Sequence, residues 1–287
     1  MPMADKELLL VFGPTAVGKT DYAIDLAERC GSPVISCDSR QIFREMKIGT
    51  APPSQEQLQR VRHYFIFSHS VTQYYTAGKY ELEALALLEE LFKTHDQLVM
   101  CGGSGLYIDA LCNGLDDFPE ADQDLRASLM QRLQTEGIES LRMELKRLDP
   151  ASYETIDLAN HQRIVRALEV TLMTGRTFSS FKTAPKKERP FAIRKIYLDR
   201  DREVLYDRIN RRVDVMMEQG LLEEARSLLP YRSMPALNTV GYRELFDYFD
   251  GKQTLDQAVE LIKRNSRRYA KRQQTWWRKD EEFRILL

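Results

Sequence analysis

The chain has 287 residues, 43% hydrophobic and 30% charged, with a formal net charge of −1. This length is enough to bury the core of one large domain and a smaller one. The apolar runs are much shorter than a membrane span and no signal peptide precedes the first predicted strand, so we expect a cytoplasmic protein with no membrane partner. The four cysteines lack C-x2-C spacing, which favours reduced thiols over a disulfide framework or a zinc site.

A complete phosphate-binding loop follows the first predicted strand. The strand is the apolar run Leu8–Phe12, and the next eight residues have the pattern G-x4-G-K-T. In such a loop, backbone N–H groups and the N-terminus of the following helix bind phosphate oxygens. Lys19 adds a positive charge, and the hydroxyl of Thr20 is a Mg²⁺ ligand. The predicted phosphate-binding residues are Gly13, Pro14, Thr15, Ala16, Val17, Gly18, Lys19 and Thr20.

Loops of this kind most often hold ATP or GTP, which makes a kinase or NTPase the default interpretation. A GTPase should carry an N/T-K-x-D motif that reads guanine, and the sequence has none. A kinase or ATPase usually has a second acid at a strand end as a Mg²⁺ partner. The one candidate is Asp199, which ends the short apolar run 196–199.

Strand and helix patterns alternate along the chain, as a parallel α/β sheet flanked by helices requires. The predicted strands are 8–12, 33–37, 63–67, 97–101 and 193–198, and the predicted helices are 19–30, 79–93, 202–219, 221–229 and 255–278. Ligand sites of open α/β sheets lie at the carboxyl ends of strands. We therefore expect 13–20, 38–41 and the glycine-rich turn 102–107 to line one crevice.

Residues 115–187 have a different sequence pattern, with long polar amphipathic stretches and no strand signal. This pattern predicts a helical insertion domain. The insertion would divide a P-loop core into a first part, residues 1–114, and a last part, residues 188–287.

Two further residues are candidates for chemistry. Asp38 follows the second predicted strand, where an isolated Asp more often caps a turn than acts in catalysis. Arg208 and Arg212 lie four residues apart on the helix 202–219, away from its apolar stripe. If that face meets the crevice, the guanidinium of Arg212 would bind phosphate oxygens opposite Lys19.

The last predicted helix is strongly basic. Residues 263–279 contain eight Lys and Arg residues and no acid. Lys263, Arg267 and Lys271 are spaced at i,i+4, as are Arg264, Arg268 and Arg272, and together they predict one cationic face. A solvated face paired with acids elsewhere is the ordinary explanation of such a stripe. Eight charges without a local counter-charge repel one another, however, which favours neutralisation by the phosphate backbone of an RNA. Trp276 and Trp277 are either core anchors or platforms for base stacking.

Seven segments together resemble the tRNA dimethylallyltransferases, also called isopentenyl-tRNA transferases. These segments are 13–20, 35–39, 48–51, 102–107, 162–169, 239–243 and 271–276. The departures from the family pattern are Val17, where a Ser is usual, and Ser104, where a Thr is usual. The sequence has no C-terminal Cys/His zinc module, so the resemblance is to the bacterial type.

The resemblance implies a P-loop NTPase-like fold and transfer of a dimethylallyl group from dimethylallyl diphosphate to N6 of the adenine 3′ to a tRNA anticodon. Asp38 would be the general base, Lys19 and Arg212 would bind the diphosphate, and Thr20 would carry Mg²⁺. The insertion would grip the anticodon stem, and the enzyme would be a monomer. The residues implied in tRNA binding are Asp38, Ser39, Arg40, Gln41, Ser104, Arg126, Gln162, Arg163, Ile164, Val165, Arg166, Asn238, Thr239, Val240, Gly241, Tyr242 and Arg243.

Two alternatives from other classes remain at this stage. A small-molecule or nucleoside kinase would share the loop and the fold but would not need an acid-free cationic helix. An RNA-binding P-loop protein without catalytic activity would keep the basic face and have no use for Asp38.

Overall fold

The computed structural model describes residues 5–182, 187–277 and 284–287. It divides into two compact units. The chain up to Cys112 and from Arg189 onward forms the first unit, and Asn113–Glu188 forms the second. The insertion boundaries expected at 115 and 187 lie within two residues of this division.

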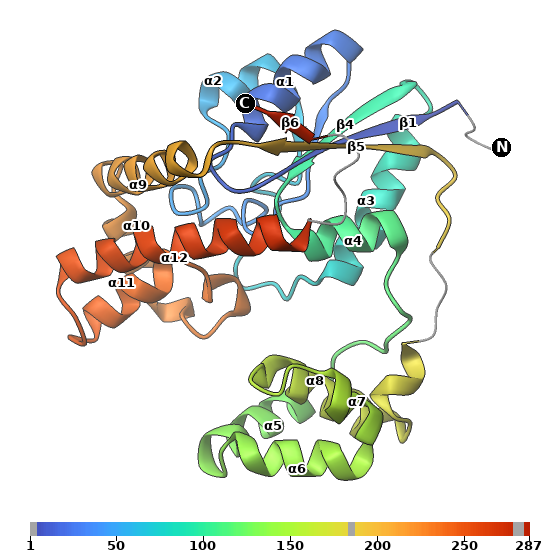
Figure 1. Cartoon of the computed structure of the whole chain (residues 1–287), viewed down its shortest axis with the longest axis vertical. Coiled ribbons are helices and arrows are strands. Elements are labelled where there is room, and N and C mark those ends of the chain that lie inside the picture. Colours follow the sequence, from blue (N-terminus) through green and yellow to red (C-terminus); the bar gives the residue numbers. More distant parts are fainter. Residues whose placement is uncertain (1–4, 183–186, 278–283) are drawn as a thin grey trace. The chain divides into compact units, whose positions relative to one another are not determined.

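The first unit is built on a six-stranded parallel sheet with the strand order β3-β2-β4-β1-β5-β6. Figure 1 shows α1 and α2 on one side of the sheet and α3, α4 and α12 on the other. The predicted parallel α/β fold is therefore confirmed. The strands are β1 (Glu7–Phe12), β2 (Val34–Ser36), β3 (His63–Tyr64), β4 (Gln97–Gly102), β5 (Ala192–Asp199) and β6 (Arg284–Leu286).

The helices of this unit follow the strands in the chain and cover both faces of the sheet. Among the predicted helices, α1 has the expected bounds and α9 ends one residue early. The helices are α1 (Lys19–Cys30), α2 (Gln55–Arg60), α3 (Ala77–Leu91), α4 (Gly105–Asn113), α9 (Arg202–Glu218), α10 (Leu221–Ser227), α11 (Tyr242–Phe249) and α12 (Leu255–Trp276).

The central strand β1 is apolar at consecutive positions because both of its faces are buried. Leu9 and Val11 belong to the core that also contains the buried face of α1. On the opposite face, the ring of Phe12 lies 5.4 Å from that of Tyr197 and 5.2 Å from that of Trp277. Trp277 is 1% exposed and is therefore a core anchor that fixes the end of α12 beneath the sheet.

The structure differs from the predicted elements where local backbone chemistry intervenes. The predicted strand 63–67 stops after Tyr64 because Phe65 and Phe67 have positive φ angles of 60° and 53°. The predicted helix 221–229 ends at Ser227, and a 3-10 turn containing Pro230 follows it. The sequence analysis did not predict α2, α4, α11 or β6. Residues Arg278 and Lys279 of the predicted last helix lie outside the described residues.

The second unit is a helical bundle, with no strand among its described residues. Leu129, Leu141, Ile164 and Leu168 are central members of its core. The helices are α5 (Gln123–Thr135), α6 (Ile138–Leu148), α7 (Pro150–Thr155) and α8 (His161–Thr174), followed by the 3-10 helix η1 (Phe178–Phe181). In the described parts of both units, no helix is long and apolar enough to cross a membrane.

The carboxylate of Asp149 joins two segments of this bundle. It is 1% exposed and accepts hydrogen bonds from the backbone N–H and the hydroxyl of both Ser152 and Ser179, at 2.6 to 3.1 Å. Burial alone would raise the pKa of Asp149, but these four bonds outweigh it and lower the pKa below its usual value.

We predict that Asp149→Asn destabilises the protein by about 1–3 kcal/mol, because the amide NH₂ would face a backbone N–H, which only donates, and the charge-assisted bonds would be lost. The lowered pKa means that this stabilisation is present above the unfolded-state pKa and is lost as the pH falls through the folded-state value. Urea unfolding at several pH values would measure the difference, which should shrink below about pH 4. Glu154→Gln, an exposed acid on α7, is the control; equal midpoints for both variants would contradict the prediction.

Candidate functional site

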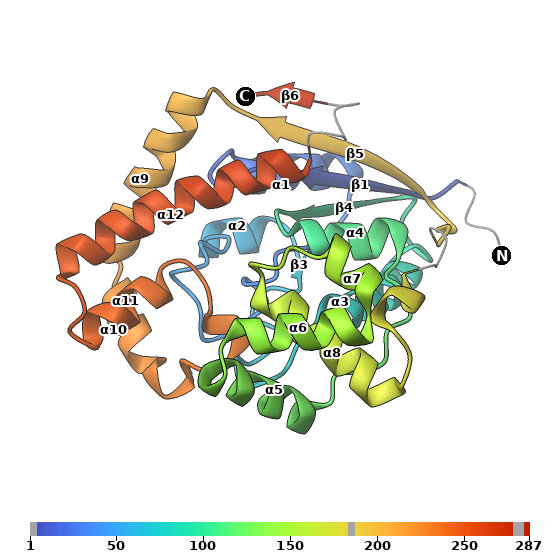
Figure 2. The same ribbon diagram turned by 60° about the horizontal axis from the view of Figure 1, so that its bottom comes forward.

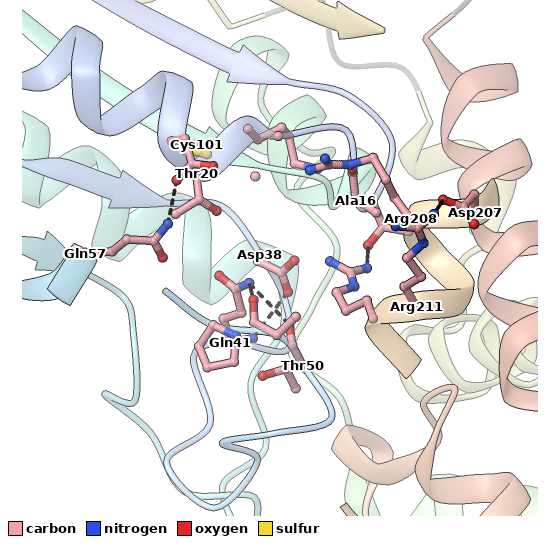
Figure 3. Close-up of a pocket in the computed structure, with 18 residues that line it drawn as sticks. Ala16, Thr20, Asp38, Gln41, Thr50, Gln57, Cys101, Asp207, Arg208 and Arg211 are labelled. Carbon is pink, nitrogen blue, oxygen red and sulfur yellow. Dashed lines mark hydrogen bonds and ion pairs between the residues drawn. The ribbon is translucent and has the colours of Figure 1, made fainter. Parts of the chain in front are cut away.

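A pocket of about 530 Å³ lies at the carboxyl ends of β1, β2 and β4. The phosphate loop, Asp38, Gln41 and Gly102 all line it, so the expected crevice exists. The opposite walls come from the segment 50–52 and from α9. Figure 3 shows Asp38 and Gln41 between Thr20 on one side and Arg208 on the other.

The phosphate loop has the backbone that anion binding needs. A Cβ atom on Gly13 would lie 2.3 Å from the carbonyl oxygen of Leu198, so only glycine fits there. Ala16 has a φ of 65° and Gly18 has a φ of 114°, left-handed conformations that turn successive N–H groups toward one side. The side chain of Val17 is fully buried and anchors the loop in the core.

Four cationic side chains bond to this loop. Lys19 Nζ donates to the carbonyl oxygen of Pro14 at 2.7 Å, and Arg208 Nε donates to that of Ala16 at 2.8 Å. Arg212 donates to the hydroxyl of Thr15. Arg200 donates to the carbonyl oxygen of Val17 at 3.3 Å.

The electrostatics of the pocket favour a polyanion. The pKa of Lys19 is lowered to about 8, chiefly by burial and also by the charge of Arg212, while Asp38 opposes the shift. Burial likewise lowers the pKa of Arg212 to about 10. Two part-buried cations therefore share one nearby carboxylate. A bound anion would relieve the cost of keeping both of them charged.

Asp38 has one oxygen committed to the fold. Its Oδ1 accepts the N–H groups of Arg40 at 2.8 Å and Gln41 at 3.2 Å, so the turn-capping role expected of an isolated Asp is present. Its Oδ2 accepts no hydrogen bond from the residues that the structure describes. Since Asp38 lines the pocket, this oxygen is available to a ligand.

Several predicted RNA-binding residues of the first unit lie beside Asp38. Ser39 N–H donates to Ser104 Oγ at 2.9 Å, and the hydroxyl of Ser104 donates to Ser39 Oγ at 3.0 Å. Arg40 Nε donates to Thr239 Oγ1 at 2.6 Å. Tyr269 of α12 hydrogen-bonds Ser104, and burial raises the pKa of Tyr269 to about 12. The segments 38–41, 104 and 238–243 and helix α12 are thus brought together.

Gln273 is a site residue that the sequence analysis did not assign. Its Oε1 accepts the N–H of Thr15 at 2.8 Å, and its Nε2 donates to the carbonyl oxygen of Gly103 at 2.7 Å. The amide of Thr15 is therefore engaged by the protein and is not free for phosphate. The signal was the position of Gln273 within the segment 271–276, which the resemblance included without a role.

Burial separates the remaining predicted residues into two groups. Asn238 and Arg243 are exposed in the first unit, and Gln162 and Arg163 are exposed in the second. The side chains that are buried, and so are not available for contact with RNA, are Ile164, Val165 and Tyr242.

The two other arginines of the second unit are tied to one acid. Arg126 and Arg166 both pair with the buried carboxylate of Glu169, at 2.7 and 3.1 Å. Arg166 also donates to the carbonyl oxygen of Pro119 at 2.7 Å.

The cationic face of α12 is divided. Lys263 pairs with Asp214 at 2.7 Å and Arg267 donates to Asn210, so this series is partly neutralised by α9. The series Arg264, Arg268 and Arg272 is exposed. The expectation of a single free face is therefore correct for one series and wrong for these two members of the other.

Trp276 behaves differently from the buried Trp277. Its ring is 47% exposed, and its indole N–H donates to Asp109 at 3.1 Å. A Cβ atom on Gly105 would lie 2.7 Å from the indole nitrogen, so the ring lies directly on this glycine.

Asp199, the candidate second acid of a kinase, is occupied elsewhere. It bonds to Arg284 and to Gln274 at 3.2 Å, and it does not line the pocket. Among the described residues, no three His, Cys, Asp or Glu side chains are grouped to hold a metal ion. Thr20 does line the pocket, and a single hydroxyl together with substrate phosphate oxygens is a donor set that suits Mg²⁺.

Comparison with known proteins gives a consistent result. The model of the IPP transferase family matches residues 41–280. A tRNA dimethylallyltransferase 1 of Bacteroides fragilis is 52% identical over 98% of this chain and 94% of its own length. That of Bacteroides thetaiotaomicron is 52% identical over 96% of this chain and 90% of its own length.

Solved structures agree with these matches. The tRNA isopentenylpyrophosphate transferase of Bacillus halodurans aligns with a TM-score of 0.71 and 36% identity, covering 98% of this chain and 89% of that chain. A eukaryotic dimethylallyltransferase acting on tRNA has a TM-score of 0.79 at 24% identity, covering 98% and 73%, which supports the fold. These matches do not support the kinase alternative. The chain belongs to the IPP transferase family, whose members are tRNA dimethylallyltransferases.

Proposed function

We propose that this chain transfers the dimethylallyl group of dimethylallyl diphosphate to N6 of the adenine on the 3′ side of a tRNA anticodon, releasing diphosphate. One observation carries the proposal: a carboxylate oxygen of Asp38, which has no partner among the described residues, shares a pocket with a cationic phosphate loop. Prenyl transfer to an amine needs a leaving-group site and a base in one place. The family assignment supports the same substrates.

The phosphate loop binds the leaving group. As the allylic C–O bond breaks, negative charge grows on the diphosphate, and Lys19, Arg212 and the N–H groups at the start of α1 stabilise it. Both cations are part-buried beside the loop, so water screens their charge less than at the open surface. Mg²⁺, held through Thr20 and the phosphate oxygens, would supply further charge neutralisation.

Asp38 takes the proton of the acceptor. The lone pair of an adenine amine is delocalised into the ring, so the amine is a poor nucleophile until it loses a proton. The Oδ2 atom of Asp38 accepts this proton as the new C–N bond forms. The adenine must leave the anticodon-loop stack to reach the pocket.

The tRNA contacts that we propose come from both units. In the first unit they are the segments 38–41 and 238–243, Ser104 and the exposed arginines of α12. In the second unit, the exposed start of α8 carries Gln162 and Arg163. We propose that the second unit grips the anticodon stem and that the enzyme acts as a cytoplasmic monomer.

A product assay tests the function. The protein is incubated with bulk tRNA and Mg²⁺ and either dimethylallyl diphosphate or ATP, and the tRNA is digested to nucleosides for mass spectrometry. A five-carbon gain on adenosine with the allyl donor alone supports the proposal. Phosphorylated product, or no product, contradicts it.

We predict that Asp38→Asn lowers the single-turnover rate by about 10²–10⁴-fold, the usual contribution of a general base. Asparagine keeps an oxygen for the N–H groups of Arg40 and Gln41, so the turn and tRNA affinity should be retained. Asp38→Ala should lose the same activity and also the turn cap. A single-turnover rate for Asp38→Asn within threefold of wild type would remove Asp38 from this role.

We predict that Lys19→Met and Arg212→Gln each lower both the affinity for the donor and the rate of transfer, because the charge they meet grows toward the transition state. Since the pKa of Lys19 is about 8, raising the pH above 8 removes its charge, and wild-type donor affinity should fall there. Lys19→Met should lack this pH dependence. Arg202→Gln, on the exposed start of α9, is the control and should change neither quantity. If Lys19→Met or Arg212→Gln weakened tRNA binding alone, the assignment of that residue would be contradicted.

We predict that replacing Arg264, Arg268 and Arg272 together by Gln reduces the log–log salt slope of tRNA binding by roughly two to three, at about 0.7–0.9 per phosphate contact. Their exposure means that the melting temperature and the donor affinity should stay the same. Lys263→Gln and Arg267→Gln are the comparison, since both residues bond to α9. An unchanged slope with a lower melting temperature would show that the exposed series is structural.

A further inference from the structure

One carboxylate outside the pocket collects an unusual number of hydrogen bonds. Glu224 lies on α10, and its Oε2 accepts the N–H groups of Lys47 and Ile48, both at 2.8 Å. Its Oε1 accepts the N–H of Gly49 at 3.0 Å and the hydroxyl of Tyr242 at 2.7 Å. Three consecutive backbone amides and one phenol therefore converge on a single side chain.

The segment that Glu224 holds continues directly into the pocket wall. Thr50 and Ala51 line the pocket immediately after Gly49. Ala51 has a φ of 46°, a left-handed conformation that costs free energy unless its surroundings enforce it. The carbonyl oxygens of both residues accept the side-chain amide of Gln41, at 3.3 and 2.9 Å. Glu224 is thus connected to the side chain of Gln41 through residues 47–51.

Close packing around Gly49 and Tyr242 makes this arrangement specific. A Cβ atom on Gly49 would lie 2.6 Å from the hydroxyl of Tyr242, so the ring packs flush against the backbone. Tyr242 is fully buried, and it begins α11 directly after the segment whose Thr239 binds Arg40. The resemblance included both 48–51 and 239–243 without explaining 48–51, and Glu224 connects the two segments.

We infer that Glu224 is a positioning residue for the acceptor side of the pocket, with Tyr242 as its partner. Its negative charge matches four converging donors, and charge-assisted bonds of this kind are the stronger ones. It fixes 47–51 in place, and 47–51 in turn fixes the amide of Gln41 next to Asp38. The inference rests on the proposed function, because Gln41 is taken to contact the tRNA.

The test uses Glu224→Gln, which keeps the shape of the side chain. One of its terminal atoms becomes an NH₂ group that faces backbone or phenol donors and cannot accept from them. We expect the KM for tRNA to rise about tenfold or more, the cost of one or two charge-assisted bonds, with kcat within about threefold of wild type. Glu223→Gln on the exposed face of the same helix removes the same charge and should leave KM unchanged.

A double-mutant cycle with Gln41→Ala separates positioning from general stability. If Glu224 acts through Gln41, the effect of Glu224→Gln on KM should fall to within about twofold once Gln41 is absent. Additive effects, or a Glu224→Gln variant that behaves like Glu223→Gln, would overturn the inference. If Glu224→Gln fails to fold, Tyr242→Phe removes one of the four donors, and its effect must likewise vanish with Gln41→Ala. Wild-type enzyme that shows no prenyl transfer would instead refute the proposed function.

Discussion

The loop between β1 and α1, which we propose binds the diphosphate, must stay fixed to the core, and the rest of the first unit meets this constraint. The loop begins at Gly13, which lies against the carbonyl group of Leu198 on β5, where any larger residue would clash. Its outer carbonyl groups are held by arginines that follow β5 in the chain. β1 lies between β4 and β5 (Figure 2), and this central position brings the phosphate loop, Asp38 and α9 to one pocket.

Four acids of the first unit differ in how many of their carboxylate oxygens have hydrogen-bond partners. Asp199 bonds to Arg284 and Gln274, and Asp207 pairs with Arg211. Both oxygens of Glu224 carry two donors each. Asp38 keeps Oδ2 without a partner in the described chain, and Asp207 likewise has a partner at only one of its oxygens, Arg211 at 2.9 Å. A free carboxylate oxygen together with a position at a strand end, in the pocket of the phosphate loop, is why we propose Asp38 as the base.

Much of this organisation could be predicted from the sequence, for identifiable reasons. The phosphate loop and α1 are local features, in which glycines, apolar runs and the lysine lie close together in the chain. Arg212 could be placed at the pocket only conditionally, because its helix had to be packed first. The strand predicted at 63–67 was too long, since nothing in its apolar residues signals the left-handed backbone of Phe65 and Phe67. Gln273 and Glu224 act across 258 and 177 residues of sequence, so no local pattern reveals their partners.

The insertion has a property that follows from how its ends are joined. Asn113 and Lys187 lie near the first and last residues of the second unit in the sequence. In space they are neighbours, because the N–H of Lys187 donates to the carbonyl oxygen of Asn113 at 2.9 Å. The chain therefore leaves and re-enters the first unit at neighbouring points, and the sheet is uninterrupted by the detour. A module attached in this way can change in length or sequence without altering the register of β4 or β5. Such an attachment lets the helical module vary in evolution while the sheet and the pocket residues that it positions stay the same.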